Sequence, residues 1–431
     1  MMPSLHKSLV RFWPALVAAL LTLFPLLQNQ RDFRVLFYFE DEWDLLSLWD
    51  QRGFGPWAGQ VFAENFVPLF KTLWGGSILF FGGSYFALIL LLWLNHALNA
   101  ALLCRIVQRL GCSGSVALLA AAGFGLSPLH YESLAWSVQW SAVLAFTFAL
   151  FGLLAIVPDS SGELAAPRWK QITIACTCSL ASALCFSRGI LTGPALALVM
   201  LLSGAQAERW VYRLAKAVLV LLPSLAVSLV IAIVSSGNHH HLRDTLLPAT
   251  NFALHYFGES PLRTSFSDTS VSDGAALALT LVHLALAGLA WKLATPRLRP
   301  LVIALLAFEI GNAVLLGVGR YHTGIPSAGC SRYQYTAIAC MLPLAAILVQ
   351  RLLVFVPQRW GNVLAAAAVA GLIWHAAIHW PPIMHNWQTW RGAELRAALS
   401  QPNYPANDHF TRLPWMTNER ARELVARFSL H

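Results

Sequence analysis

The chain has 431 residues, of which 57% are hydrophobic and only 11% are charged. This composition excludes an ordinary soluble globular protein, in which about 25% of the residues are charged. The formal net charge of +9 comes from short basic clusters between apolar segments, a pattern typical of loops beside anionic lipid rather than of a nucleic-acid partner.

Long apolar runs predict an all-α polytopic membrane protein. Unpaired backbone groups are costly in hydrocarbon, so continuous apolar runs of roughly 20 residues are expected to be helices rather than open strands. We expect about eleven membrane crossings from these runs. Their approximate ranges are 9–28, 84–104, 112–129, 138–157, 172–187, 190–204, 214–235, 274–292, 300–318, 335–350 and 361–379.

Basic residues predict the orientation of these helices. With a cytoplasmic N-terminus, every inner loop is basic, as at Arg105 and Arg351, which is the bias that cytoplasmic loops show. The outer side then holds the loop 29–83. We divide the chain into a transmembrane domain over 1–380 and a periplasmic C-terminal tail over 381–431.

Two outer segments are expected to form further helices. Within the loop 29–83, residues 43–49 and 67–81 combine aromatic and apolar side chains with a few polar ones, as in helices that lie along a membrane interface. In the tail, residues 417–428 have the pattern of a short amphipathic helix.

Four acidic residues among aromatic ones follow the first apolar run: Glu40, Asp41, Glu42 and Asp44. Acids at a membrane edge need water, a cation or a substrate beside them. A transferase that moves a sugar onto a hydroxyl needs a carboxylate to take the acceptor proton or to hold a metal. The cluster is therefore a candidate active site, with a solvated acidic loop as the alternative.

A second polar segment is expected at the same side of the membrane. Pro128 ends a helix, and His130 and Glu132 follow it among aromatic residues. A carboxylate on the same face as Asp41 strengthens the hypothesis of a site there.

Three arginines at expected outer helix ends oppose the bias of basic residues toward the inside: Arg188, Arg320 and Arg332. A phosphate group is a natural reason, because the guanidinium fork matches its oxygens. The alternative is that these arginines pair with the acids. Adjacent to Arg332, Tyr333 belongs to the same segment.

These motifs, in this order, resemble those of the lipid-linked-sugar glycosyltransferases of the GT-C fold, which include protein O-mannosyltransferases and bacterial aminoarabinose transferases. The resemblance is strongest over residues 35–140. It rests on Asp41-Glu42, Asn95-His96-Ala97-Leu98-Asn99, the segment 128–136 and Ser331-Arg332-Tyr333.

The resemblance implies a GT-C-like bundle and an inverting sugar transfer from a polyprenyl phosphate. By position, Asp41 would be the general base, Glu42 its neighbour and Glu132 a supporting carboxylate. Arg332, with Arg188 or Arg320, would hold the lipid phosphate. His130 and Tyr333 are the remaining candidates for substrate binding.

We therefore predict a hexosyl- or pentosyltransferase of a bacterial inner membrane, with its active site on the periplasmic side. Its donor would be a polyprenyl-phosphate sugar, and its acceptor an envelope glycan, lipid or protein. No metal site or cofactor is assigned, and a divalent metal at the acids stays an open alternative.

The alternative functions are a transporter or flippase of a lipid-linked glycan, and a noncatalytic scaffold. A transporter would need charges inside the bundle and similar internal halves, and the sequence shows little of either.

Overall fold

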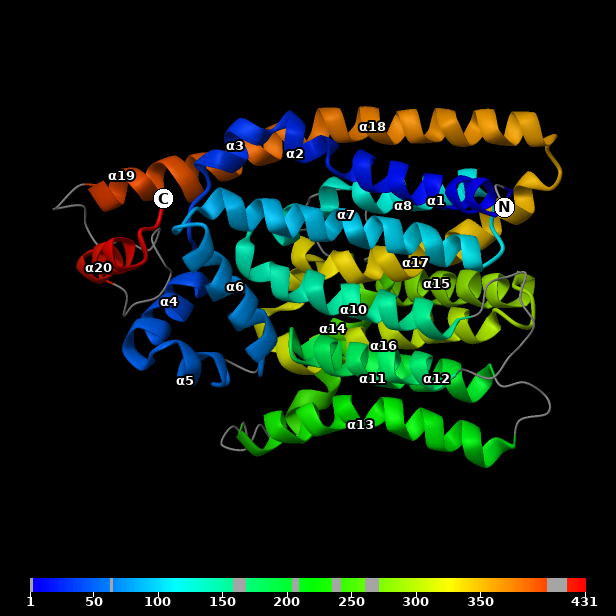
Figure 1. The fold of residues 1–431 in the computed structure, drawn as a ribbon, viewed down its shortest axis with the longest axis horizontal. Helices are drawn as coiled ribbons and strands as arrows, with labels where there is room; N and C mark the ends of the chain where they lie inside the picture. The colour runs from blue at the N-terminus through cyan, green and yellow to red at the C-terminus, as the bar shows by residue number, and fades with distance from the viewer. Residues whose placement is uncertain are drawn as a thin grey trace.

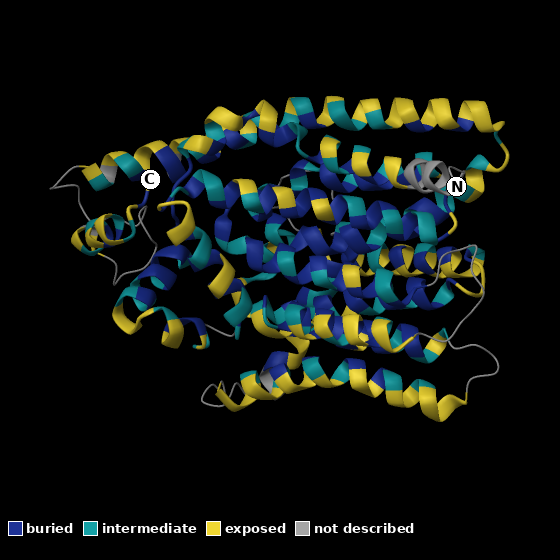
Figure 2. Ribbon diagram, viewed as in Figure 1, coloured by how far each residue is buried: buried dark blue, intermediate teal, exposed yellow. Residues whose placement is uncertain are grey.

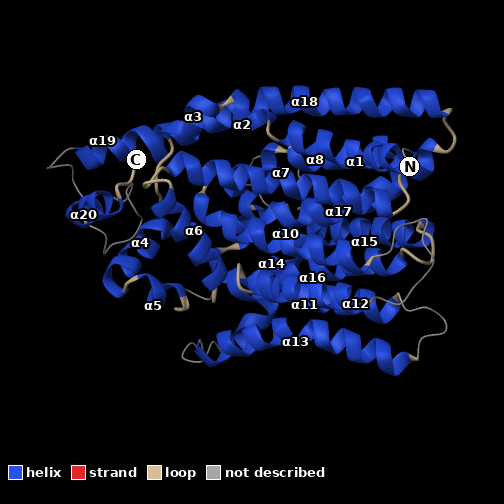
Figure 3. Cartoon of the chain, viewed as in Figure 1, coloured by secondary structure: helices blue, strands red, loops and turns tan. Residues whose placement is uncertain are grey.

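The computed structural model describes residues 3–62, 65–157, 168–203, 209–234, 242–259, 271–400 and 417–431. In this part of the chain all regular elements are helices (Figure 3), apart from one isolated bridge between Phe62 and Asn65. The prediction of an all-α protein is confirmed.

Long helices lie beside one another along a common direction and form a bundle (Figure 1). They are α1 (Pro3–Thr22), α7 (Tyr85–Arg109), α8 (Gly114–Gly125), α10 (Trp140–Ile156), α11 (Trp169–Ala183), α12 (Thr192–Leu202), α13 (Trp210–Val234), α15 (Asp273–Leu293), α16 (Arg299–Arg320), α17 (Ser331–Leu353) and α18 (Gln358–Gln388). Each predicted span overlaps one of these helices.

The bundle has the length and composition of a multi-pass membrane protein. Among the described residues, seven helices are long and apolar enough to cross a membrane, and three shorter apolar helices accompany them. The outward faces of α13 and α18 are exposed (Figure 2) and carry side chains such as Leu229 and Trp374. Such faces suit lipid rather than water. The number of eleven crossings stays a prediction.

Shorter helices gather at the end of the bundle opposite the N-terminus, and we call this the loop end (Figure 1). They are α2 (Phe24–Gln28), α3 (Gln30–Val35), α4 (Asp41–Arg52), α5 (Phe54–Ala58), α6 (Pro68–Phe80), α9 (Tyr131–Ala135), α19 (Glu394–Ser400) and α20 (Asn418–Phe428). The helices expected within 43–49, 67–81 and 417–428 are thus present as α4, α6 and α20. Their position at a membrane interface stays a prediction.

The start of α4 follows from its sequence. Asp41, Glu42 and Asp44 all lie in its first turn, where negative charge interacts favourably with the helix dipole. The helix ends at Arg52, and the next residue, Gly53, has a φ of 78°, a conformation that glycine adopts without strain. The acidic cluster is therefore presented by the N-terminus of a helix rather than by an irregular loop.

The C-terminal segment packs on the loop end, and it is continuous with the bundle. Helix α18 continues to Gln388, so the predicted boundary at 380 falls inside a helix. Beyond it, Arg420 of α20 contacts Asp50 of α4 at 2.8 Å, and Phe428 packs against Trp49 at a ring separation of 4.6 Å. The backbone of His431 then pairs with that of residues 83 and 85.

Helix α14 (Leu242–Glu259) was not predicted, because its region was assigned to an outer loop. The segment carries Arg243, Asp244 and His255, which reduce its apolar character. Its aromatic residues Phe252 and Tyr256 are nevertheless fully buried, and α14 packs against α15 and α16. Tertiary contacts therefore stabilise a helix whose sequence lacks a strong apolar pattern.

A substitution at Gly83 tests the packing of the C-terminal residues on the loop end. Its φ is +81°, and a Cβ there would overlap the carbonyl oxygens of Phe428 and Ser429. Gly82, at φ +59°, has open space around it. We expect Gly83→Ala to lower the free energy of unfolding by about 1–3 kcal/mol more than Gly82→Ala does, because only the former displaces the C-terminus. Thermal unfolding in detergent measures this difference, and equal effects would show that the C-terminus does not pack there.

Candidate functional site

A cavity of about 540 Å³ lies at the loop end, where the segment 29–83 meets the ends of several bundle helices. One side is formed by the start of α4, and the other by η3 (Ser187–Leu191), the end of α16 and the start of α17. Its polar and charged lining residues are Glu40, Asp41, Asp44, Asn65, Gln139, Ser141, Arg188, Arg320, Arg332 and Tyr333.

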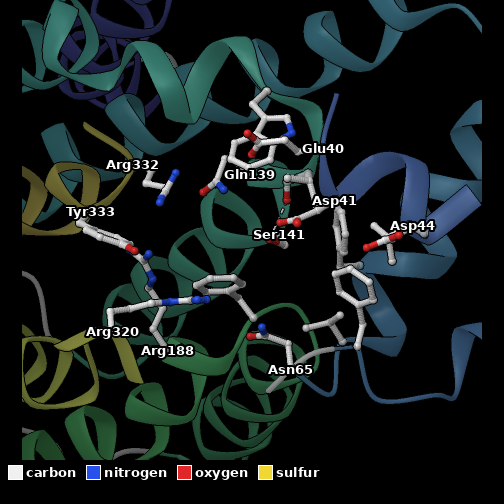
Figure 4. Close-up of a pocket in the computed structure, with 17 residues that line it drawn as sticks. Glu40, Asp41, Asp44, Asn65, Gln139, Ser141, Arg188, Arg320, Arg332 and Tyr333 are labelled. Atoms are coloured by element: carbon white, nitrogen blue, oxygen red, sulfur yellow. Dashed lines mark hydrogen bonds between the residues drawn. The ribbon is translucent and has the colours of Figure 1, made fainter. Parts of the chain in front are cut away.

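Opposite charges face each other across this cavity. Figure 4 shows Glu40 and Asp41 on one side and the guanidinium groups of Arg188 and Arg320 on the other. Asp44 also lines the cavity, and aromatic rings lie between it and the arginines (Figure 4). Three guanidinium groups at one wall repel one another, so an anion bound between them would be stabilised.

Arg188 is held rigidly although it is charged. Only 4% of its surface is exposed, and Nη1 donates a hydrogen bond to Thr336 Oγ1 at 2.7 Å. Its guanidinium also lies over the ring of Phe186, 4.9 Å from the ring centroid. These contacts place the group at the cavity wall before any ligand binds, which reduces the entropy cost of binding.

Glu132 lies beside Arg332 and is not among the residues that line the cavity. Its Oε2 accepts a hydrogen bond from the backbone nitrogen of Arg332 at 2.9 Å, and its Oε1 is 4.0 Å from Nη1 of the same residue. In return, the backbone nitrogen of Glu132 donates to Ser331 Oγ at 3.3 Å. This carboxylate, predicted to be catalytic, therefore holds the first turn of α17 and orients an arginine.

Glu42, the second predicted catalytic acid, is fully buried and turned away from the cavity. Its carboxylate accepts hydrogen bonds from the backbone nitrogens of Phe39 (2.7 Å) and Val138 (3.1 Å). It also accepts from the hydroxyls of Ser137 and Tyr85. Asp41 lines the cavity, whereas the hydrogen bonds from Phe39, Ser137 and Val138 hold the Glu42 carboxylate in the protein interior.

The network around Glu42 supports a strained turn. Glu40 has a φ of +43°, which is unusual for a residue other than glycine and is costly unless its surroundings maintain it. Glu42 links this turn to η2 (Ser137–Gln139), which contributes Gln139 to the cavity. Burial raises the pKa of Glu42 to about 7, and the hydrogen bonds from Ser137, Phe39 and Val138 limit that rise.

His130, predicted to bind substrate, is instead a core residue. It is fully buried, and its ring packs against those of Tyr335, Phe124 and His96 at centroid distances of 4.9, 5.0 and 5.6 Å. The turn that begins at Pro128 directs the ring into the bundle. A direct contact between His130 and a ligand in the cavity is not supported by this placement.

Sequence reasoning missed the neutral polar residues of the cavity, Asn65, Gln139 and Ser141, and two buried cations near it. Lys71 Nζ donates to the carbonyl oxygens of Trp57 and Gln60 at 3.0 and 2.9 Å, and burial lowers its pKa to about 8. Arg391 lies 3.8 Å from the ring centroid of Phe39, behind the acidic turn. Interspersed aromatic residues were the only signal for these cations.

The acids of the cavity do not form a recognisable metal centre. Within the described ranges, no group of three or more His, Cys, Asp or Glu side chains is arranged to hold a metal ion. The chemistry that these residues can perform themselves is proton transfer by a carboxylate and anion binding by guanidinium groups.

Comparisons with known proteins find similar solved structures but no similar sequences. No protein-family model and no curated protein matches the sequence. An oligosaccharyltransferase from Archaeoglobus fulgidus, solved with Zn and sulfate, is similar at a TM-score of 0.46 and 13% identity over 94% of this chain, which spans 58% of that protein. ArnT from Cupriavidus metallidurans, bound to undecaprenyl phosphate, is similar at a TM-score of 0.44 and 16% identity over 98% of this chain and 77% of that one. The function proposed below rests on the cavity's own residues.

The position of Glu42 predicts a dependence of stability on pH. Its pKa is raised from 4.5 to about 7 in the folded protein, so the folded form binds the proton more tightly than the unfolded form. Protonation of Glu42 therefore adds to the free energy of unfolding, by on the order of 3 kcal/mol. This contribution is fully present below about pH 4.5 and is lost as the pH rises through about 7.

Glu42→Gln removes this titration. As the pH rises from 5 to 8, we expect the wild type to lose stability relative to Glu42→Gln. Thermal unfolding of both proteins at each pH measures this change. A difference that stays constant over this range would contradict the burial of an ionisable carboxyl at this position.

Proposed function

We propose that this chain is an integral membrane glycosyltransferase of the GT-C type. It transfers a hexosyl or pentosyl unit from a polyprenyl-phosphate sugar to a hydroxyl of a cell-envelope glycan, lipid or protein. The observation that carries this proposal is that Asp41 faces Arg188, Arg320 and Arg332 across one cavity, at one end of an apolar bundle.

The arginine wall suits the donor. A polyprenyl phosphate carries its negative charge at a membrane surface, and guanidinium groups bind phosphate oxygens through charge-assisted hydrogen bonds. When the bond between the sugar and the phosphate breaks, its electron pair passes to a phosphate oxygen. Arg188, Arg320 and Arg332 then stabilise the additional charge on the leaving group. Tyr333, adjacent to Arg332 at the cavity, completes this wall.

The acidic wall suits the acceptor. Asp41 lines the cavity on the side opposite the arginines (Figure 4), and we assign it as the general base. It removes the proton of the acceptor hydroxyl while the oxygen attacks the anomeric carbon from the side opposite the phosphate. This geometry inverts the anomeric configuration. Aromatic rings lie between Asp44 and the arginines (Figure 4), so Asp44 is a poorer candidate.

The distribution of basic residues supports a site on the outer side of the membrane. Arg109 ends α7, Arg351 lies in the last turn of α17, and Arg359 in the first turn of α18. These helix ends lie at the end of the bundle opposite the cavity (Figure 1). Because cytoplasmic loops are rich in Lys and Arg, we propose a bacterial inner-membrane protein with a cytoplasmic N-terminus and a periplasmic cavity.

Asp41→Asn tests the general base. We expect transfer from polyprenyl-phosphate sugars by the purified protein in nanodiscs to fall by about 10²- to 10⁴-fold, because the amide cannot accept the proton. Binding of the polyprenyl phosphate should be retained. Asp32→Asn, the same change on α3 and outside the cavity, is the control. Full activity of Asp41→Asn would remove Asp41 from this role.

Arg188→Lys and Arg332→Lys test the phosphate site. Lysine keeps the charge but loses the planar fork, so we expect the KM for the lipid-linked donor to rise by at least about tenfold. The exposed Arg31→Lys is the control. If both cavity variants keep the wild-type KM, the donor phosphate does not bind at this wall. If the wild type moves a lipid-linked glycan across proteoliposomes without transferring its sugar, the protein is a transporter.

A further inference from the structure

A second polar cluster lies inside the bundle, away from the residues that line the cavity. It consists of His283 on α15 and of Glu309 and Asn312 on α16, each at most 2% exposed. Residues three apart on a helix share a face, so Glu309 and Asn312 point in similar directions. An ionisable residue inside an apolar bundle is costly and needs a specific partner.

His283 presents a lone pair to this cluster. Its Nδ1 lies 3.2 Å from the carbonyl oxygen of Phe257, and a carbonyl only accepts, so Nδ1 carries a hydrogen. The neutral ring then has an acceptor at Nε2, which faces Glu309 Oε2 at 3.6 Å. Two acceptors therefore oppose each other at a distance longer than a hydrogen bond. The ring of Phe257, stacked on His283 at 4.4 Å, fixes this orientation.

Asn312 supplies another acceptor. Its Nδ2 donates to the hydroxyl of Tyr256 at 2.7 Å, which leaves Oδ1 available. Within this cluster, four buried acceptor atoms have no hydrogen-bond partner among the described residues: Glu309 Oε1 and Oε2, Asn312 Oδ1 and His283 Nε2. Burying several such atoms without a partner is strongly unfavourable.

We propose that His283, Glu309 and Asn312 bind one divalent cation of the zinc class. A cation between His283 Nε2 and Glu309 Oε2 would bind both of these acceptors, and Asn312, one helical turn from Glu309, would supply a third ligand. A single proton on Glu309 would form a hydrogen bond to His283 and leave Asn312 Oδ1 without a partner. Two ligand atoms bonded to one zinc ion at ~2.0–2.1 Å lie roughly 3.3 Å apart in tetrahedral geometry, within a few tenths of an ångström of the observed separation. An imidazole ligand favours zinc over calcium or magnesium, which take oxygen ligands.

The surrounding hydrogen bonds are those expected around a metal site. A metal-binding histidine usually donates its other ring N–H to a carbonyl or carboxylate, as His283 does to Phe257. Asn312 in turn is oriented by Tyr256, whose hydroxyl donates to the carbonyl oxygen of Tyr333 at 3.3 Å. Because Tyr333 lines the cavity, the cation would connect α15 and α16 to one wall of the proposed active site.

The experiment measures the metal content of the purified full-length chain in detergent, after incubation with Zn²⁺ and removal of the free ion. We expect about one zinc per wild-type chain by mass spectrometry. Glu309→Gln and His283→Gln should each weaken zinc binding by at least about tenfold, and Asn312→Asp should retain it. Added Zn²⁺ should also raise the thermal midpoint of the wild type but not that of Glu309→Gln.

His255→Gln is the matched control. His255 is also buried, but its Nδ1 lies 2.7 Å from Glu259 and its Nε2 lies 2.9 Å from Asp273, so both nitrogens already have hydrogen-bond partners. Its replacement should leave zinc binding at the wild-type level. A wild type that retains no zinc and shows no shift in its midpoint would overturn the proposal, and this result needs no variant. Equal zinc retention in the wild type, Glu309→Gln and His283→Gln would overturn it too.

Discussion

The burial of the Glu42 carboxylate is the interaction on which the loop end depends. A charged group without access to water is tolerated only when donors surround it, and Glu42 has backbone and hydroxyl donors from both the acidic turn and η2. This network holds Glu40 at a positive φ and directs Asp41 into the cavity. A residue that takes no part in the proposed chemistry thus helps to position the carboxylate that we propose as the general base.

A similar relation holds at the opposite wall. Glu132 contacts the backbone and the guanidinium of Arg332, and Thr336 accepts a hydrogen bond from Arg188. The cavity can therefore keep like charges together without a ligand, because a neighbouring side chain holds each of these two arginines. A phosphate bound there would replace repulsion between guanidinium groups by attraction, which is the basis of the proposed function.

The sequence predicted the helical fold because apolar runs of membrane length leave the backbone few alternatives. It also identified the acid and the arginines that share the cavity, since charges at the ends of apolar helices are conspicuous. It could not predict which of Asp41 and Glu42 lines the cavity, because the sequence does not reveal which side of the helix faces the cavity. Nor could it show that the ring of His130 is buried in the bundle, and α14 was missed because buried contacts, rather than its own composition, stabilise it.

The most direct measurement is a cryo-electron microscopy structure of the protein in nanodiscs with a bound polyprenyl phosphate. Our account predicts phosphate density within hydrogen-bonding distance of Arg188, Arg320 and Arg332, with the Asp41 carboxylate across the cavity from it. Phosphate bound at the opposite end of the bundle, or an Asp41 side chain outside the cavity, would contradict the account.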